Sequence, residues 1–496
     1  MQLRAAFGAA LLALATPVAA NDAPITVAVP GGTIAGVQVP GALVFRGIPY
    51  AAPPLGTLRW RPPVPVVAWN GVRDATHPAP ACLQKSEGWN QANYLYSSED
   101  CLTLDIRTPA LDGKRPVMVW IHGGSNRSGS SGGPAESSMT DHDIVHVGIQ
   151  YRLGLLGFMS HPALTAEQGG ASGNYALMDQ IAALQWVHDN IERFGGDPNN
   201  VTIYGESAGS QDVSLLLAAP AAQGLFHRAI LQSGTPGFGM SYRSLADAEA
   251  VGMQLDEKAD AGGDIARLRA LSPVALLDLQ QEVSDPAAEQ GRSTWLRITI
   301  DGKVLPEAPD RLIARNDTKP VMIGVDKVEF GPGSDDMDLL GLAETWFPGH
   351  ASEALAAYRS EPSPDPRRGH LSLRLQSDGE FHCPADRLAD LLARNGWPTW
   401  FYEFDVGENG GLTRHAYEIG FIFGSDPVGG GVRMQDYWAA FATGGDPNGP
   451  TPAARARPRW ERWDPTHPRQ MTFAMDRTAM APGKPRAEFC RFATAY

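Results

Sequence analysis

The chain of 496 residues has only four cysteines, and none of them belongs to a Cys-x-x-Cys pair. It also has no His-Glu-x-x-His motif, so nothing in the sequence indicates a bound metal. No run of Lys and Arg could follow a phosphate backbone, and the formal net charge of −14 is moderate for a chain of this size. We therefore expect neither a metal site nor a nucleic-acid partner.

Long apolar runs without charge are missing after residue 20. The first 20 residues contain Arg4, an apolar stretch from Ala5 through Val18, and a small-residue cleavage site at Val18-Ala19-Ala20. This stretch is shorter than the roughly 20 apolar residues that a membrane-spanning helix needs. The sequence therefore predicts a secretory signal peptide over residues 1–20. It also predicts a soluble mature chain over residues 21–496, periplasmic or secreted, without stable insertion in a membrane.

If the chain is exported, its cysteines can form disulfides, because disulfides persist in oxidising compartments. Four cysteines allow three pairings. Cys82 and Cys101 are the closest in sequence and would close a local loop. Cys383 and Cys490 would then tie the C-terminal tail to the body of the protein, and we expect this pairing.

Internal repeats and linker-like shifts in composition are also missing, which favours one folded unit after the signal. Apolar, β-branched segments with turn residues on both sides are typical of buried strands. They are Pro116–Ile121, Ile144–Gln150, Val201–Tyr204, Ala229–Gln232, Pro320–Val325 and Trp400–Asp405. The clearest helical pattern, Asn174–Phe194, has one apolar stripe. This alternation predicts an α/β fold, with a mostly parallel sheet covered on both faces and functional groups at the strand ends.

Glycine is abundant, with 54 residues, so a Gly-x-Ser-x-Gly pattern alone is weak evidence for a nucleophile. The pattern occurs at 129–133, in a Gly/Ser loop, and at Gly205-Glu206-Ser207-Ala208-Gly209. Only the second lies between a strand-like and a helix-compatible segment. A sharp strand-to-helix turn raises the serine hydroxyl above the sheet, and flanking glycines relieve the clash across it. We therefore predict that Ser207 is a nucleophile rather than part of an inert turn.

A second glycine motif follows the strand-like residues 117–121, in His122-Gly123-Gly124-Ser125. Glycine pairs in this position supply backbone N–H groups that bind a developing oxyanion. Each such donor is typically worth about 3 to 4 kcal/mol of barrier in acyl transfer. We expect the donors to be the N–H groups of Gly124, Ser125 and Ala208, with Gly123 shaping the turn and His122 in a structural role.

Together with these motifs, several segments resemble the type-B carboxylesterases, a family that includes cholinesterases, bacterial p-nitrobenzyl esterases and some fungal lipases. The resemblance covers nearly all of the mature chain. The segments that carry it include Phe45–Ala51, Pro53–Gly56, Glu99–Asp105, Phe194–Pro198, Gly205–Gly209 and Gln232–Gly234. The resemblance implies an α/β-hydrolase fold in a single domain with loop and helical excursions. It also implies a serine esterase that acts on small-molecule carboxylic esters and needs no cofactor.

The resemblance also nominates the other members of a catalytic triad. The segment Gly324–Glu329 looks like the family's acid segment, which implies Glu329, with Asp326 as the alternative. His415 begins a segment similar to the family's base motif, and it follows the acid in sequence as this fold requires. Two other histidines after the acid are poorer candidates, since His382 adjoins a cysteine and His467 lies in a proline-rich stretch.

Further positions match the family around the triad. They are Ser233 and Glu418, and we expect Glu206 there as well. Cys82–Cys101 matches the family's N-terminal loop bridge, and Cys383–Cys490 matches a longer bridge of cholinesterases. Ser125 departs from the pattern, because it stands where a third glycine is usual.

The expected reaction is ester hydrolysis through a covalent acyl-enzyme, with His415 as base and Glu329 orienting it. Two alternatives are an inactive, cholinesterase-like binding module and a lipase acting on emulsified lipid. The complete set of triad residues disfavours the first, and the mostly polar helix-like region Ser241–Arg297 disfavours an apolar lid. Short to medium esters are the default substrates. Arg127 could pair with an anionic acyl group, although a solvent-facing arginine is the favoured interpretation.

Overall fold

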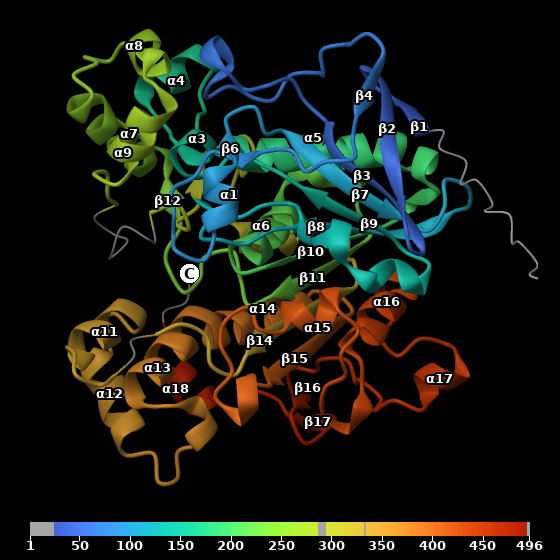
Figure 1. Cartoon of the computed structure of the whole chain (residues 1–496). Coiled ribbons are helices and arrows are strands. Elements are labelled where there is room, and N and C mark those ends of the chain that lie inside the picture. Colours follow the sequence, from blue (N-terminus) through green and yellow to red (C-terminus); the bar gives the residue numbers. More distant parts are fainter. Residues whose placement is uncertain (1–23, 286–293, 332–333, 494–496) are drawn as a thin grey trace, which may run out of the picture.

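The structure, a computed structural model, describes residues 24–285, 294–331 and 334–493 (Figure 1). The predicted signal peptide lies outside the described residues. Across these three ranges, no helix is both long enough and apolar enough to pass through a bilayer.

A sheet of 13 strands, counted over the described residues, forms the centre of the molecule (Figure 1). In spatial order its strands are β1 (Ile25–Val29), β2 (Gly32–Val39), β3 (Ala42–Pro49), β7 (Thr103–Thr108), β9 (Val145–Ile149), β8 (Arg115–Ile121), β10 (Gly196–Glu206), β11 (Arg228–Gln232), β14 (Val321–Asp326), β15 (Thr399–Asp405), β16 (Arg469–Ala474) and β17 (Thr478–Pro482), and β4 (Val72–Asp74) pairs with β2. Neighbours from β9 to β16 are parallel, and β4 also pairs with β2 in parallel. The remaining pairs, toward both ends of the sheet, are antiparallel. The predicted mixed, mostly parallel sheet is therefore confirmed.

Two small sheets lie outside this one, β5 (Ala81–Cys82) with β6 (Ser97–Ser98) and β12 (Arg243–Ser244) with β13 (Thr299–Ile300). The α-helices are α1 (Gln91–Leu95), α2 (Gly133–Glu136), α3 (Gly154–Phe158), α4 (Pro162–Glu167), α5 (Tyr175–Asn190), α6 (Ala208–Ala218), α7 (Leu245–Lys258), α8 (Ile265–Ala270), α9 (Pro273–Gln280), α10 (Pro309–Ile313), α11 (Leu339–Trp346), α12 (Ala351–Arg359), α13 (Leu371–Gln376), α14 (Cys383–Arg394), α15 (Ile419–Phe423), α16 (Met434–Gly444), α17 (Pro452–Arg455) and α18 (Ala487–Cys490). The helix predicted over 174–194 is α5 followed by a 3₁₀ turn, Ile191–Phe194.

The sheet is buried on both faces, and strand β8 shows why its sequence is apolar throughout. Val117, Val119 and Ile121 pack into one core with residues of α5 and α6. Met118 and Trp120, which alternate with them, pack into a second core with residues of α16. Because successive side chains of a strand point to opposite faces, a run without polar positions is the expected pattern for such a strand.

The structure contains both expected disulfides. Cys82–Cys101 closes a loop with a sequence separation of 19 that carries α1. Cys383–Cys490 has a separation of 107 and joins the start of α14 to the end of α18. The second bridge therefore ties the C-terminal segment to a helix that packs on β14 and β15.

Candidate active site

Four chain segments that follow parallel strands meet at the carboxyl edge of the sheet. They follow β8, β10, β14 and β15 and carry Gly123, Ser207, Glu329 and His415, respectively. Functional groups collect at this edge in open α/β sheets. Ser207 and His415 line the same cavity of about 530 Å³, together with residues of the loop after β8.

Ser207 occupies a strained turn between β10 and α6. Its backbone has φ 57° and ψ −126°, which is a rare conformation for a residue with a side chain. A Cβ at Gly209 would lie 2.0 Å from the Ile121 carbonyl oxygen, and one at Gly205 would lie 2.5 Å from the Gly209 carbonyl carbon. Both glycines are therefore needed for the turn, and the N–H of Ser207 is held by the Gln232 carbonyl at 2.9 Å.

The structure brings Glu329 and His415 together, although 86 residues separate them. Oε2 of Glu329 lies 2.6 Å from Nδ1 of His415, and the glutamate side chain is fully buried. Its other oxygen accepts a hydrogen bond from the backbone N–H of Asp326 at 2.8 Å. The N–H of Glu329 donates to Ser377 Oγ at 3.0 Å. The carboxylate is thus fixed on both oxygens.

The other ring nitrogen of His415 contacts Glu206 rather than Ser207. Nε2 forms an ion pair with Oε1 of Glu206 at 2.9 Å, and in the described part of the chain it makes no hydrogen bond to the Ser207 hydroxyl. Burial alone would lower the pKa of His415, but the carboxylates of Glu206 and Glu329 raise it well above its usual value. Hydrogen bonds of catalytic groups are often loose without substrate.

The loop after β8 lies directly against the turn at Ser207. A Cβ at Gly123 would lie 2.6 Å from the Glu206 carbonyl oxygen and 3.1 Å from Cβ of Ser207, so only glycine fits there. Gly124 has φ 108°, and Ser125 has φ 55°, the left-handed region that a glycine adopts more readily. Ala208 is the first residue of α6, where the backbone N–H has no partner within the helix.

His122, at the start of this loop, packs against Tyr151 and also lines the cavity that contains Ser207. Its ring stacks on Tyr151 at 4.4 Å between centroids, and the Tyr151 hydroxyl donates to the His122 carbonyl. Burial lowers the pKa of His122 to about 4, so the ring is neutral near pH 7.

Beside Glu329 and His415 lies a cluster of buried acids that includes Asp326 and Glu418. Oε1 of Glu418 accepts from the Gln232 side chain at 3.1 Å, and Ser233 Oγ accepts from the Asp326 N–H at 3.2 Å. Burial raises the pKa of Asp326 well above its usual value, and the negative charge of Glu418 raises it further. Burial, with Glu206 nearby, raises the pKa of Glu418 to about 7. Asp326 is therefore a buried acid close to Glu329, and Glu329 is the carboxylate that contacts His415.

Sequence reasoning missed the aromatic rings beside His415 and the nearby acid Glu380. Phe330 and Phe381 lie 3.9 and 5.0 Å from the imidazole between ring centroids. Phe381 and Glu380 belong to a buried π-helical turn, Ser377–His382, and burial raises the pKa of Glu380 to about 7. A π-helical turn is common at functional sites but has no clear sequence pattern.

The preferred interpretation of Arg127 was wrong, because its side chain is 12% exposed and does not face solvent. It pairs with Glu87 of the disulfide loop at 2.6 Å. Both residues line the cavity that contains Ser207.

A mixed sheet covered by helices, with a serine at a strand-turn-helix junction on its carboxyl edge, defines an α/β-hydrolase fold. A model of the carboxylesterase family matches residues 23–339 and 346–493. The chain is 34% identical to fumonisin B1 esterase of Sphingopyxis macrogoltabida over 484 residues, which cover 91% of this chain and 87% of that protein. It is 32% identical to liver carboxylesterase 1 of Oryctolagus cuniculus (85% and 84%) and 34% identical to cocaine esterase of Homo sapiens (87% and 83%). The chain therefore belongs to the carboxylesterase family and is a carboxylic ester hydrolase.

Proposed function

We propose that Ser207, His415 and Glu329 form the catalytic triad of this esterase. His415 takes the proton of Ser207 as the hydroxyl oxygen attacks the ester carbonyl, and Glu329 holds the imidazole in position and stabilises its charged form. The same imidazole then protonates the leaving alcohol and later activates the water that hydrolyses the acyl-enzyme. The contact of 2.6 Å between His415 and Glu329, beside the strained serine, is the observation that supports this proposal most strongly.

The oxyanion of each tetrahedral intermediate would be bound by the backbone N–H groups of Gly124, Ser125 and Ala208. The close approach of the Gly123 turn to Ser207 supports this assignment. The triad and these donors consist of protein groups alone, and no step in the scheme requires a cofactor.

The substrate cavity supports esters with apolar substituents. Aromatic and aliphatic side chains form much of its wall, namely those of Trp89, Trp120, Phe330, Ile419 and Phe423. Its volume of about 530 Å³ falls in the usual range for small-molecule sites. We propose short to medium carboxylic esters as substrates. A p-nitrophenyl ester series of rising acyl length, measured with the wild type and Ser207→Ala, tests the chemistry and the acyl preference together.

A lipase remains the second candidate because of one observation. Large apolar side chains are exposed on the disulfide loop beside the cavity, at Trp89, Tyr94, Leu95 and Tyr96. Such a surface could contact aggregated lipid. A lipase would show a sharp rise in rate when a soluble ester is raised above its solubility limit, whereas an esterase would follow saturation kinetics throughout.

We also propose that residues 1–20 are removed during export and that residues 21–496 form the mature catalytic domain. Two disulfides fit an oxidising compartment. N-terminal sequencing of the exported protein should begin at Asn21, and fractionation would distinguish the periplasm from the medium.

A further inference from the structure

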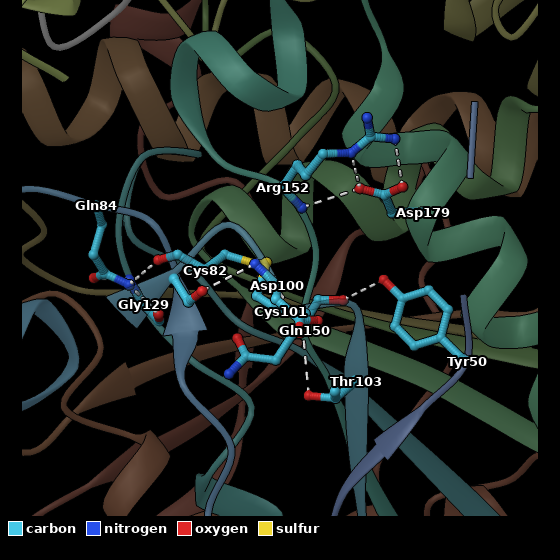
Figure 2. Close-up of a disulfide and its surroundings, with 11 residues drawn as sticks. Tyr50, Cys82, Gln84, Asp100, Cys101, Thr103, Gly129, Gln150, Arg152 and Asp179 are labelled. Atoms are coloured by element: carbon cyan, nitrogen blue, oxygen red, sulfur yellow. Dashed lines mark hydrogen bonds and ion pairs between the residues drawn. A yellow bond between two sulfur atoms is a disulfide. The ribbon is translucent and has the colours of Figure 1, made fainter. Parts of the chain in front are cut away.

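The loop closed by the Cys82–Cys101 disulfide contacts the loop after β8 through one buried amide, that of Gln84. Nε2 of Gln84 donates to the Gly129 carbonyl at 2.8 Å, and Oε1 of Gln84 accepts from the Gly129 N–H at 2.9 Å. The side chain therefore pairs with both polar backbone groups of one residue, 45 positions away in sequence. Figure 2 shows this contact next to the Cys82–Cys101 bridge.

Gln84 uses its full hydrogen-bonding capacity in this place. Its second N–H donates to the Cys82 carbonyl at 2.9 Å, and Oε1 also accepts from Asn90 Nδ2 at 2.8 Å. An amide has two donor hydrogens and an oxygen with two lone pairs. Gln84 is fully buried, so water does not compete for these contacts.

Gly129 packs directly against the start of the loop that carries the expected oxyanion donors. It has φ 117°, and a Cβ on it would lie 2.5 Å from the Gly123 carbonyl oxygen and 2.3 Å from His122 Nδ1. Between the two, the Gly124 carbonyl accepts from the N–H groups of Arg127 and Ser128 at 3.0 Å each. Residues 123–129 thus form a tight turn whose far end is fixed by Gln84.

We infer that Gln84 is a positioning residue for catalysis, which sets the place of the oxyanion donors through Gly129. This inference rests on the proposed function, because it matters only if the loop after β8 binds the oxyanion. Donors must be preorganised to act, and a displacement of about 1 Å can cost about 100-fold in rate. The Cys82–Cys101 loop then contributes to turnover, although Gln84 itself does not line the cavity.

The test compares Gln84→Ala with Asn448→Ala. Asn448 makes the same kind of two-bond clamp, on the N–H and carbonyl of Trp460 at 2.7 and 2.9 Å, and does not line the catalytic cavity. Gln84→Ala should lower kcat by about 10-fold or more with KM little changed. Its affinity for a trifluoromethyl ketone, whose adduct with Ser207 carries an oxyanion, should fall by about the same factor as kcat/KM. Asn448→Ala should keep wild-type kinetics even if its melting temperature falls equally.

A kcat within twofold of wild type for Gln84→Ala, in a preparation where Ser207→Ala is inactive, would overturn the inference and leave the proposed function standing. If Ser207→Ala is itself active, the proposed function fails instead. Should Gln84→Ala not fold, Gln84→Glu takes its place, because a carboxylate still accepts from Gly129 and Asn90 but cannot donate to the Gly129 carbonyl. It should show the same loss of kcat and of ketone affinity.

Discussion

Nε2 of His415 lies 2.9 Å from Oε1 of Glu206, the residue directly before Ser207 in the chain. Since Glu329 occupies Nδ1, the imidazole is held between two carboxylates that both favour its charged form. A general base must be neutral to accept a proton. Glu206 therefore competes with the nucleophile for Nε2, and it opposes the form of His415 that the reaction needs.

The first prediction concerns the pH dependence of Glu206→Gln. Removing this negative charge lowers the pKa of His415, so the acidic limb of the kcat/KM profile should move to lower pH. The other acids that face His415, Glu329 and Glu380, keep their positions. Glu136→Gln, which changes an exposed carboxylate, is the control. An acidic limb at the wild-type pH in Glu206→Gln would contradict the assigned role.

Asp326→Asn tests the buried acid beside the triad. The unfolded chain loses this proton near pH 4, whereas the folded protein, with its raised pKa, retains it. The folded state is therefore penalised as pH rises above about 4, and an amide is not. The variant should melt about 2 °C or more above wild type at pH 8, and the difference should shrink toward pH 4.

Its activity should stay near that of wild type, because Glu329 rather than Asp326 contacts His415. The exposed Asp141→Asn serves as the control and should show no such trend. A melting temperature that falls further below wild type as pH rises would show that Asp326 is stabilising as an anion.

Because the Glu87–Arg127 pair lies in the cavity wall, altering its charge should change the preference between anionic and neutral esters. Because Glu87 balances the charge of Arg127 at the cavity wall, the present site should not prefer anionic esters. Glu87→Gln leaves a net positive charge, so the ratio of kcat/KM for an anionic ester to that for a neutral ester of equal size should rise about 3-fold or more. Arg127→Ala should lower that ratio or leave it unchanged. An unchanged ratio in Glu87→Gln would remove this pair from substrate recognition.

The two disulfides should differ in what their loss affects. Replacing Cys383 and Cys490 by alanine opens a loop with a separation of 107 and should cost about 2 to 5 kcal/mol of stability, with kcat little changed. Replacing Cys82 and Cys101 opens a loop with a separation of only 19, but that loop holds the oxyanion turn through Gln84. Thermal melts and kcat of both double variants separate the effects. An equal kcat in the two double variants would contradict a role of the Cys82–Cys101 loop in turnover.

The elements that could be predicted from sequence are those fixed by short-range pattern. The strand before His122 and the helix over 174–194 were predicted because their apolar periodicity reflects burial on particular faces. The turn at Ser207 was predicted because its two glycines are sterically required. Glu329 and His415 came from resemblance, since their meeting depends on the spacing of β14 and β15 in the sheet, which no local pattern encodes.

What the sequence did not reveal depends on contacts between distant segments. Nothing near Gln84 indicates that it clamps Gly129, because the contact exists only once the disulfide loop has folded over the oxyanion loop. The same holds for the burial of Arg127 by Glu87. Glu380 approaches His415 through a π-helical turn that an ordinary helical period does not predict.

The most direct test of the triad is the pre-steady-state reaction with p-nitrophenyl acetate, followed by peptide mass analysis of the acid-quenched enzyme. We predict a burst of one p-nitrophenol per active enzyme, an acetyl group on the peptide that contains Ser207, and neither burst nor acetyl group in Ser207→Ala. His415→Ala and Glu329→Gln should slow the burst by about 10⁴-fold or more. An acetyl group on another residue, or an unchanged burst in Ser207→Ala, would contradict the account.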